Sequence, residues 1–324
     1  MADPSEKIVA AAPGKQVVQT AGPSSYEVPE QKSDAAVVGA APPSVAYWMG
    51  GPPPQYAKFA SGSAGRPNIV HDHGFLDSND GKHLLDKSKM RPPEARDHTE
   101  RWAWLAKLWA AKRWRPELFD ATTAYHHFHY GKGETLRFSY DKFVQQDASG
   151  RRALRSAIED VIAACVAYHD QTLSTGDPAK DNFEITSDAI VGSRKPDARW
   201  PYPATENWQK AIGGHSIWLW ARVMVAFDPQ KTTRTFSVTM CLVAEDMYNF
   251  NPGALDIKTG IPDSANGRFE LCGMAQEFLQ QAQLFRAFSF HAPAKVPYGQ
   301  RYEPPGLDID AIVKPPFTYP AERT

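Results

Sequence analysis

The alternation of apolar and polar residues is most regular between His215 and Tyr248. In HSIWLWARVMVAFD, which begins at His215, every second side chain from Ile217 to Phe227 is apolar. RTFSVTMCLVAEDMY, which ends at Tyr248, repeats the pattern after the turn DPQKT. A period of two is typical of a strand with one buried face. The two runs therefore predict a long antiparallel hairpin, with the polar sequence EDMYNFN at its end.

Helical periodicity surrounds this hairpin. Apolar residues recur every three or four positions in three earlier segments, and we predict a helix in each. These helices span residues 97–114, 120–133 and 151–170. After the hairpin, the segment 268–284 has the same period and predicts a further helix. We expect short strands at 183–186 and 285–293, and an extended or turn conformation over 139–150.

The two ends of the chain lack any such period. Residues 1–65 are rich in Pro and Ala, which predicts a disordered or extended arm. We therefore predict an α+β fold in which a helical N-terminal half packs on an antiparallel, partly barrel-like sheet. The predicted divisions are the arm at 1–65, a linker with an amphipathic helix at 66–119, an activity domain at 120–295, and a Pro-rich C-terminal tail at 296–324.

The helix predicted over 97–114 is unusually aromatic. Trp102, Leu105, Leu108 and Trp109 fall at helical spacing, and basic residues gather at its C-terminal end. Such a helix is suited to contact a membrane surface or a receptor. The alternative, which we favour from the sequence, is that the tryptophans pack onto the body of the protein.

Composition and charge narrow the classes of partner. The chain has 324 residues and a net charge of -1, so we expect no nucleic acid partner. Its three cysteines show no CxxC spacing and are expected to be reduced core residues. No apolar run approaches the roughly 20 residues that span a bilayer. The first residues do not resemble a Sec signal peptide, so we expect any export to use another route.

The polar residues after the hairpin form the candidate site. Asp246, Tyr248 and Asn249 lie where the second strand ends, and strand ends and the following loops commonly carry function. The hairpin brings the start of its first strand, at His215, back to the same end. The loop beyond the hairpin adds acidic residues and a guanidinium: Asp256, Asp263 and Arg268.

Two structural alternatives accompany this site. Asp and Asn at a strand end also cap turns by bonding their own backbone. Farther upstream, the sequence HDH at 71–73 places two histidines two positions apart, but no cysteine stands nearby to complete a zinc set. We therefore interpret HDH as part of a surface loop.

The order of these features resembles the activity domain of the colicin M family over residues 120–292. The resemblance includes AYHHFHYGKGETLRFSY, the β-rich half with its long hairpin, and above all DMYNFN followed by GRF. The family pattern is Asp-x-Tyr-Asp-Phe, a short loop and His-Arg. Here Asn249 replaces the second Asp, the loop is longer, and Gly267 replaces the histidine before Arg268.

The resemblance implies a bacteriocin that hydrolyses lipid II, the undecaprenyl-pyrophosphate-linked peptidoglycan precursor, in the periplasm of a target bacterium. It would be secreted without a Sec signal, through a receptor or secretion machine contacted by the N-terminal arm, and would be accompanied by an immunity protein. A membrane surface is a further possible contact, with no transmembrane segment. The alternative is a non-catalytic binding or adaptor protein that retains the fold.

The implied reaction assigns roles to the candidate residues. Asp246 would bind Mg²⁺ or act as a base, and Arg268 would bind phosphate oxygens. Tyr248 would orient substrate or water, and Asn249 would supply an uncharged hydrogen bond. His215 or Asp263 would be the general base. Which residue replaces the family's histidine is left open by the sequence.

Overall fold

The computed structural model describes residues 56–61, 65–78, 80–172, 181–195, 197–297, 300–314 and 316. The predicted N-terminal arm lies outside these ranges up to residue 55, as does the end of the C-terminal tail beyond residue 316.

Seven strands form a single open sheet. They are β1 (Phe59–Ser61), β2 (Leu136–Arg137), β3 (Phe183–Ser187), β4 (Ile190–Val191), β5 (Ser216–Phe227), β6 (Thr233–Tyr248) and β7 (Phe278–Pro293). The order is β1-β3-β5-β6-β7-β2, with β4 also paired to β5. All pairs are antiparallel except β2 with β7. The α+β class is confirmed.

The prediction of a partly barrel-like sheet is wrong, because the sheet does not close. Its two edge strands, β1 and β2, lie at opposite ends of the strand order. Each is only two or three residues long, so it offers few free backbone groups to another strand.

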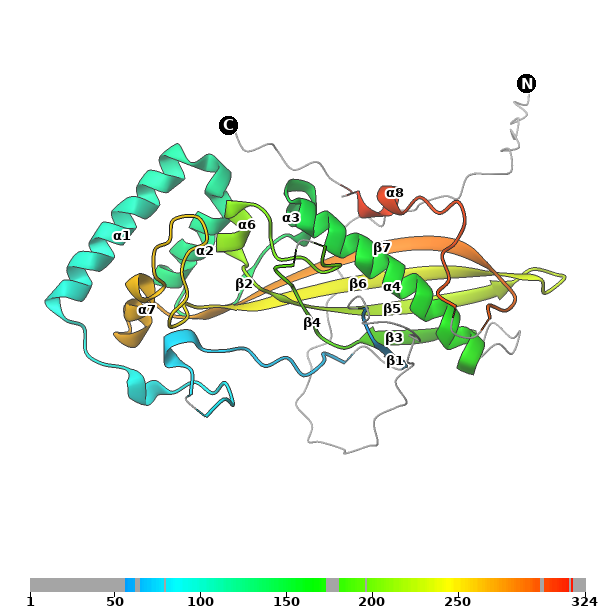
Figure 1. The fold of residues 1–324 in the computed structure, drawn as a ribbon, viewed down its shortest axis with the longest axis horizontal. Helices are drawn as coiled ribbons and strands as arrows, with labels where there is room; N and C mark the ends of the chain where they lie inside the picture. Colours follow the sequence, from blue (N-terminus) through cyan, green and yellow to red (C-terminus); the bar gives the residue numbers. More distant parts are fainter. Residues whose placement is uncertain are drawn as a thin grey trace, which may run out of the picture.

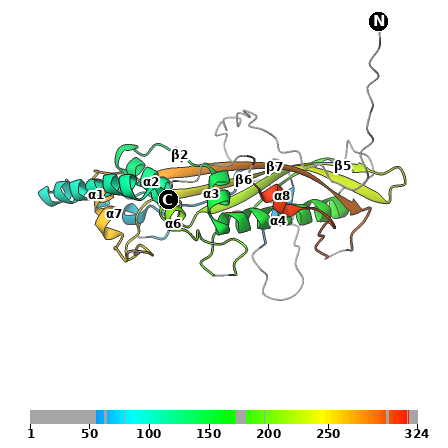
Figure 2. The ribbon, with the colours of Figure 1, turned by 90° about the horizontal axis from the view of Figure 1, so that it is seen from above.

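The helices lie on one face and at one end of this sheet. They are α1 (Ala95–Trp114), α2 (Phe119–Tyr130), α3 (Tyr140–Gln146), α4 (Ala148–Thr172), α6 (Glu206–Ala211), α7 (Ser264–Leu271) and α8 (Ile309–Val313). Three short 3-10 turns are η1 (Gly74–Leu76), η2 (Lys87–Lys89) and η3 (Pro116–Leu118). Figure 1 shows α4 running along the sheet, while α1, α2 and α7 gather where β6 ends and β7 begins. Figure 2 shows α4 and α8 on the same side of the sheet.

The hairpin prediction is confirmed, and it organises the main core. β5 pairs with β6 along the whole length of β5, from Ser216 with Glu245 to Phe227 with Arg234. The predicted apolar face is buried, including Leu219, Val223 and Leu242. It packs against the apolar stripe of α4, which the sequence also predicted. A second, smaller core lies under the end of the hairpin and joins α2, α7 and β7 through Phe128, Phe269 and Phe278.

Three local predictions are wrong. The helix predicted over 268–284 is α7 followed by the start of β7, because Gly273 leaves the helix at a φ of +68° and Phe278 onward pairs with β6. The extended segment predicted over 139–150 contains α3, whose first turn is capped by the Ser139 hydroxyl accepting from the Lys142 N–H. The C-terminal tail contains α8, with Ile312 and Val313 buried.

The remaining general expectations can be compared with the described residues. The end of the predicted arm forms β1, which agrees with an extended conformation. All three cysteines are free and buried, as predicted. Among the helices in the described ranges, none is long and apolar enough to cross a membrane.

Candidate functional site

A cavity of about 580 Å³ opens where the hairpin ends. Its walls are contributed by α1, α2 and α6, by the last residues of β6, and by the loop between β6 and α7. Of the six residues predicted for the site, four line the cavity: Asp246, Tyr248, Asn249 and Asp263. The other two, His215 and Arg268, do not line it.

Asp246 lies near the end of β6, opposite Gln280 of β7. Burial raises the pKa of its carboxyl well above the ordinary value, and the nearby Asp72 carboxylate raises it further. Removal of the carboxyl from water and a like charge both disfavour ionisation. Asp246 is therefore poised to exchange a proton or to accept a cation.

Asp72 reaches the cavity from the HDH segment, far upstream in the sequence. The Asn249 side-chain amide donates to the Asp72 backbone oxygen at 2.8 Å and to its Oδ1 at 2.9 Å. The Gly74 N–H donates to the same Oδ1 at 3.0 Å. Asn249, which stands where the resembled family has an Asp, thus holds another carboxylate in the cavity.

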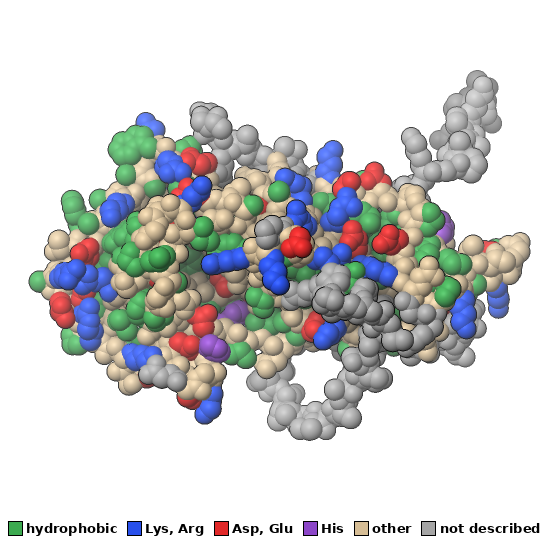
Figure 3. Space-filling model, in the orientation of Figure 1, with side chains coloured by type: hydrophobic (Ala, Val, Ile, Leu, Met, Phe, Trp, Pro, Cys, Tyr) green, Lys and Arg blue, Asp and Glu red, His purple; other side chains and the backbone are tan. Residues whose placement is uncertain are grey.

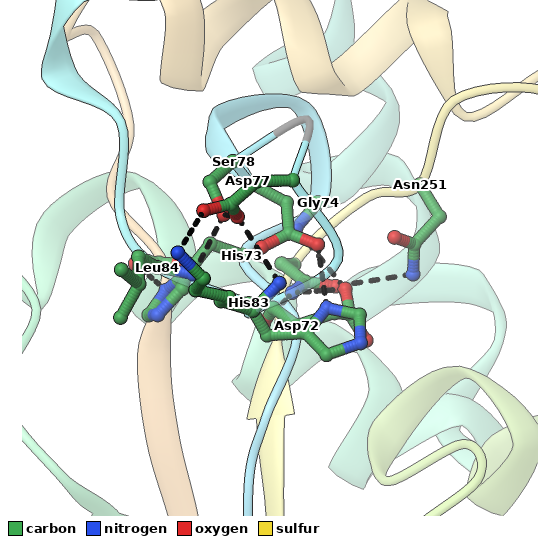
Figure 4. A network of polar contacts seen from close by, with 12 residues as sticks. Asp72, His73, Gly74, Asp77, Ser78, His83, Leu84 and Asn251 are labelled. Atoms are coloured by element: carbon green, nitrogen blue, oxygen red, sulfur yellow. Dashed lines mark hydrogen bonds and ion pairs between the residues drawn. The ribbon is translucent and has the colours of Figure 1, made fainter.

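The segment that carries Asp72 is fixed by its own polar contacts. Its two histidines each bind a carboxylate of the sheet region: His71 Nε2 lies 3.0 Å from Glu245, and His73 Nδ1 lies 2.8 Å from Glu277. Figure 4 shows Asp72 beside Gly74, with Asp77, Ser78 and His83 closing the loop behind it and Asn251 directed toward the same network. The surface-loop prediction for HDH therefore missed an ordered contribution to the cavity.

Two glycines allow this segment to pack so closely. Gly74 has a φ of +53°, and a Cβ there would lie 2.2 Å from the Phe250 backbone oxygen. At Gly267, where the resembled family has histidine, a Cβ would lie 2.0 Å from the Phe75 ring. The space that a histidine side chain would take is therefore filled by the ring next to the HDH segment.

Asp263 lies at the other end of the loop between β6 and α7, directly before α7. Its Oδ2 accepts from the Asn251 N–H at 3.1 Å, and burial raises the pKa of its carboxyl. Asn266, one turn into α7, accepts from the Tyr125 hydroxyl at 2.6 Å. Asp256 accepts from the Thr259 N–H, which folds the loop upon itself, and pairs with Lys210, which ties the loop to α6.

Tyr248 is held by aromatic packing. Its ring stacks on Phe278, with centroids 4.9 Å apart, and its edge meets Phe250 at 5.9 Å. Burial raises the pKa of its phenol, and the carboxyls of Asp263 and Glu270 add to the effect. The phenol therefore stays protonated at neutral pH and can donate a hydrogen bond into the cavity.

Glu270 lies behind the cavity on α7 and was not predicted from the sequence. It is 2% exposed, and neither carboxyl oxygen has a hydrogen-bond partner in the described part of the chain. Burial raises its pKa to about 9, with further contributions from Glu277, Asp72 and Asp263. Glu270 is therefore neutral at pH 7 and is a second buried acid beside the site.

His215 is brought to the correct end of the hairpin, next to the pair of Ser216 with Glu245, but its side chain belongs to the core. It is 1% exposed and packs against Tyr140 and Phe143. Its Nε2 lies 3.5 Å from the Tyr140 hydroxyl. Burial lowers its pKa to about 4, so the ring is neutral at pH 7.

Arg268 faces α1 instead of the cavity. Its Nη2 lies 2.7 Å from Oδ1 of Asp97, a carboxylate with no exposed surface. Arg91 binds the other oxygen of Asp97 at 2.6 Å. The hydrogen bond from Arg91, aided by that from Arg268, holds the pKa of Asp97 well below its ordinary range. In this structure Arg268 joins α7 to α1.

Other cations take the position near the cavity that the sequence assigned to Arg268. Lys107 of α1 and Arg194 line the cavity, each over an aromatic ring: Trp104 at 4.0 Å and Tyr202 at 4.8 Å. Within the described ranges neither forms an ion pair with a carboxylate. Apolar side chains line the rest of the wall, among them Leu108, Leu118, Ile212 and Ile261.

The donor groups can be compared with those that Mg²⁺ needs. Among the described residues, no three His, Cys, Asp or Glu side chains are grouped to hold a metal ion. Of the four carboxylates that line the cavity, Asp72 and Asp246 lie close enough for the charge of Asp72 to raise the pKa of Asp246. Mg²⁺ in phosphate sites takes one or two carboxylates and completes its shell with water and substrate oxygens. Asp72 and Asp246 are the residues that would hold such an ion.

Comparison with known proteins adds no relative. No protein-family model, no curated protein and no solved structure matches this chain.

Proposed function

We propose that the protein is a hydrolase that cleaves a phosphate ester bond in an amphiphilic substrate, and specifically an antibacterial toxin that cleaves lipid II at its undecaprenyl-pyrophosphate linkage. The observation that carries the hydrolase proposal is the cavity in which Asp246 meets Asp72 beside Tyr248 and Asn249. The lipid II substrate is supported by the resemblance of DMYNFN and GRF to the colicin M family.

The cavity has the two kinds of surface that such a substrate needs. Phosphoryl transfer depends on positioning and on cations that stabilise the charge on the phosphate oxygens. Lys107 and Arg194 supply positive charge, while Leu108, Leu118 and Ile261 supply an apolar wall for a prenyl chain. A polar end and an apolar end within one cavity favour a lipid-linked phosphate over a free nucleotide or sugar phosphate.

The acids divide the chemistry between them. Asp246 and Asp72 would hold Mg²⁺, which would polarise the phosphate and lower the pKa of a bound water. Asp263, which lines the same cavity and whose pKa burial raises, would take a proton from the water as the water oxygen bonds to phosphorus, and would return it to the prenyl oxygen as the bond from phosphorus to that oxygen breaks. Tyr248 would donate a hydrogen bond to the phosphate. The products are the free polyprenol and the pyrophosphate-bearing disaccharide peptide.

The test is cleavage of purified lipid II in detergent with and without Mg²⁺. We expect turnover that EDTA abolishes and Mg²⁺ restores, and a loss of about 10²-fold or more in Asp246→Asn and in Asp72→Asn. Asp310→Asn, in an exposed helix of the tail, is the matched control and should retain activity. Periplasmic expression of the wild type should lyse cells, and Asp246→Asn should not.

A non-catalytic binding protein is the second candidate, and the replacements at Asn249 and Gly267 favour it. Binding without turnover in the same assay would support this candidate and reject the hydrolase. Equal turnover by wild type and Asp246→Asn would reject the mechanism.

A further inference from the structure

Helix α1 presents an outward face that the rest of the described chain leaves uncovered. Trp102 is 73% exposed, Trp109 56% and Trp114 73%. Trp102, Trp109 and Arg113 recur at intervals of seven and four residues, so they lie along one side of the helix. The opposite side carries the buried residues Asp97 and Leu108. The favoured sequence interpretation, in which the tryptophans pack onto the body, is therefore wrong for Trp102 and Trp114. Trp104 does pack against Tyr125, and the exposed Trp109 ring touches the His126 ring of α2 with one edge.

The C-terminal part of α1 and the residues directly after it are strongly basic. From Arg101 to Pro116 the sequence contains five basic residues and no acidic one. The five are Arg101, Lys107, Lys112, Arg113 and Arg115. Lys112 lies over the Trp109 ring at 5.2 Å, so cation and aromatic groups are interleaved on the surface. Tryptophan with lysine and arginine is the composition of helices that lie in the interface of an anionic bilayer.

Exposed apolar groups continue beyond α1 at the same end of the molecule. Phe119 and Tyr130, at the two ends of α2, are 56% and 46% exposed. Leu255 and Ile257, in the loop that lines the cavity, are 60% and 53% exposed. Figure 3 shows apolar side chains scattered over this end, around α1 and the loop, with basic and acidic groups among them.

We infer that α1 docks this end of the protein on an anionic membrane surface, with Trp102, Trp109 and Trp114 inserted at the headgroup level. The inner side of the same helix lines the cavity through Trp104, Lys107 and Leu108. Docking would place the cavity beside the bilayer that holds a lipid-linked substrate. The biological purpose rests on the proposed function, but the docking itself does not require turnover.

The test is co-sedimentation of the full chain with vesicles of phosphatidylcholine, alone or mixed equally with phosphatidylglycerol. We expect binding to the anionic vesicles, a blue shift of tryptophan emission, and weakening at high salt, which screens the basic residues. Replacing Trp102, Trp109 and Trp114 together by Ser should lower the partition coefficient by about tenfold or more.

A matched triple variant replaces exposed apolar residues elsewhere on the sheet: Val191→Ser, Met224→Ser and Phe285→Ser. It should bind vesicles as the wild type does. Absence of vesicle binding, or equal binding by the tryptophan variant, would overturn the inference. So would a concentration-dependent dimer in gel filtration that only the tryptophan variant abolishes, because the face would then bind a second copy.

The two proposals fail in different assays. If the tryptophan variant cleaves lipid II in detergent but not in vesicles, both hold. If the wild type binds anionic vesicles and cleaves lipid II in neither form, the proposed hydrolase is rejected and the docking stands.

Discussion

Asp246 occupies a position that disfavours its charged form. Its pKa is raised by burial and by Asp72, whereas in the unfolded chain it returns to the ordinary value near 3.8. Between the two pKa values the unfolded state binds fewer protons, so this residue lowers stability as pH rises above about 4. A group kept at such a cost is more readily explained by chemistry than by folding.

Asp246→Asn should therefore be more stable than the wild type at pH 8, because the amide has no charge that burial would disfavour. The difference should shrink toward zero near pH 3, where the wild-type carboxyl is protonated in both the folded and the unfolded state. Urea unfolding at the two pH values measures it, with Asp310→Asn as the exposed control. Equal destabilisation at both pH values would instead assign Asp246 a structural role.

The buried carboxyl of Glu270 leads to a related prediction about stability, over a wider pH range. Its pKa is about 9 in the folded chain against an ordinary value of 4.5, so stability attributable to this residue declines as pH rises from about 4.5 to 9. Glu270→Gln removes the titrating proton and keeps the shape.

We expect the melting temperature of Glu270→Gln to exceed that of the wild type at pH 8.5 and to match it at pH 4.5. Thermal scans across this range test the expectation, with the exposed Glu303→Gln as control. If the melting temperatures of variant and wild type changed with pH in parallel, Glu270 would be ionised in the folded protein.

The sequence predicted part of the candidate site for a topological reason. A long hairpin must return its ends to one place, so Asp246, Tyr248 and Asn249 and the loop carrying Asp263 could be grouped from alternation alone. The direction of a helical side chain is different. Arg268 lies on α7, and its guanidinium turns to Asp97, a residue 171 positions earlier. No local sequence pattern predicts a partner that lies so far away along the chain.

At the scale of elements, the segment 71–76 contacts both positions at which the sequence departs from the resembled pattern. Phe75 fills the space beside Gly267, and Asp72 bonds to Asn249. Residues 249 and 267 are thus both in contact with this one upstream segment. The sequence showed the two departures but not these contacts, because residues 72 and 249 are 177 positions apart.

Gly267→His should be destabilising by about 1–3 kcal/mol, the range typical of overpacking, because its Cβ would meet the Phe75 ring. Phe75→Ala should also be destabilising, through a lost apolar contact. The double variant should lose clearly less than the sum of the two, since the smaller residue at 75 makes room for the histidine.

Urea unfolding of the two single variants and the double variant gives the coupling energy. Gly81→His, at a glycine with no atom within 4 Å of the added Cβ, controls for the effect of a histidine itself, although its φ of +72° adds strain. Additive losses at 75 and 267 would contradict the packing that we describe.

Elements with one clear period were predicted, and elements with two compatible periods were not. β5, β6 and α4 each follow one apolar period over most of their length, and their types are confirmed. At the start of β7, Phe278 and Leu279 continue the helical spacing of Met274 and Ala275, and pairing of Phe278 onward with β6 decides for the strand. The short α3 depends on its Ser139 cap and on burial of Tyr140 and Phe143, which a period of this length does not reveal.

At the scale of the whole molecule, Asp160 of α4 joins three distant parts of the chain. Its Oδ2 accepts from the Ala57 N–H at 2.9 Å, next to β1. Its Oδ1 binds Arg199 at 2.6 Å and Arg301, in the C-terminal tail, at 2.8 Å. Burial raises the pKa of Asp160 despite both arginines, so the carboxylate depends on all three contacts.

Asp160→Asn should therefore loosen both ends of the chain together. The variant leaves Arg301 without this carboxylate, whereas Arg199 keeps Glu159 at 3.0 Å, and both arginines are partly exposed. We therefore expect a loss by urea unfolding below the range of about 3–5 kcal/mol that is typical of a fully buried pair, and faster proteolysis in the segment around Ala57 and in that around Arg301. Asp188→Asn is a matched control, because its carboxyl oxygen accepts from the Lys58 N–H but has no arginine partner among the described residues. If Asp160→Asn exposes only one of the two ends, or if the control loses as much stability, Asp160 does not couple the termini. The edge strand β1 would then be held by its pairing with β3 alone.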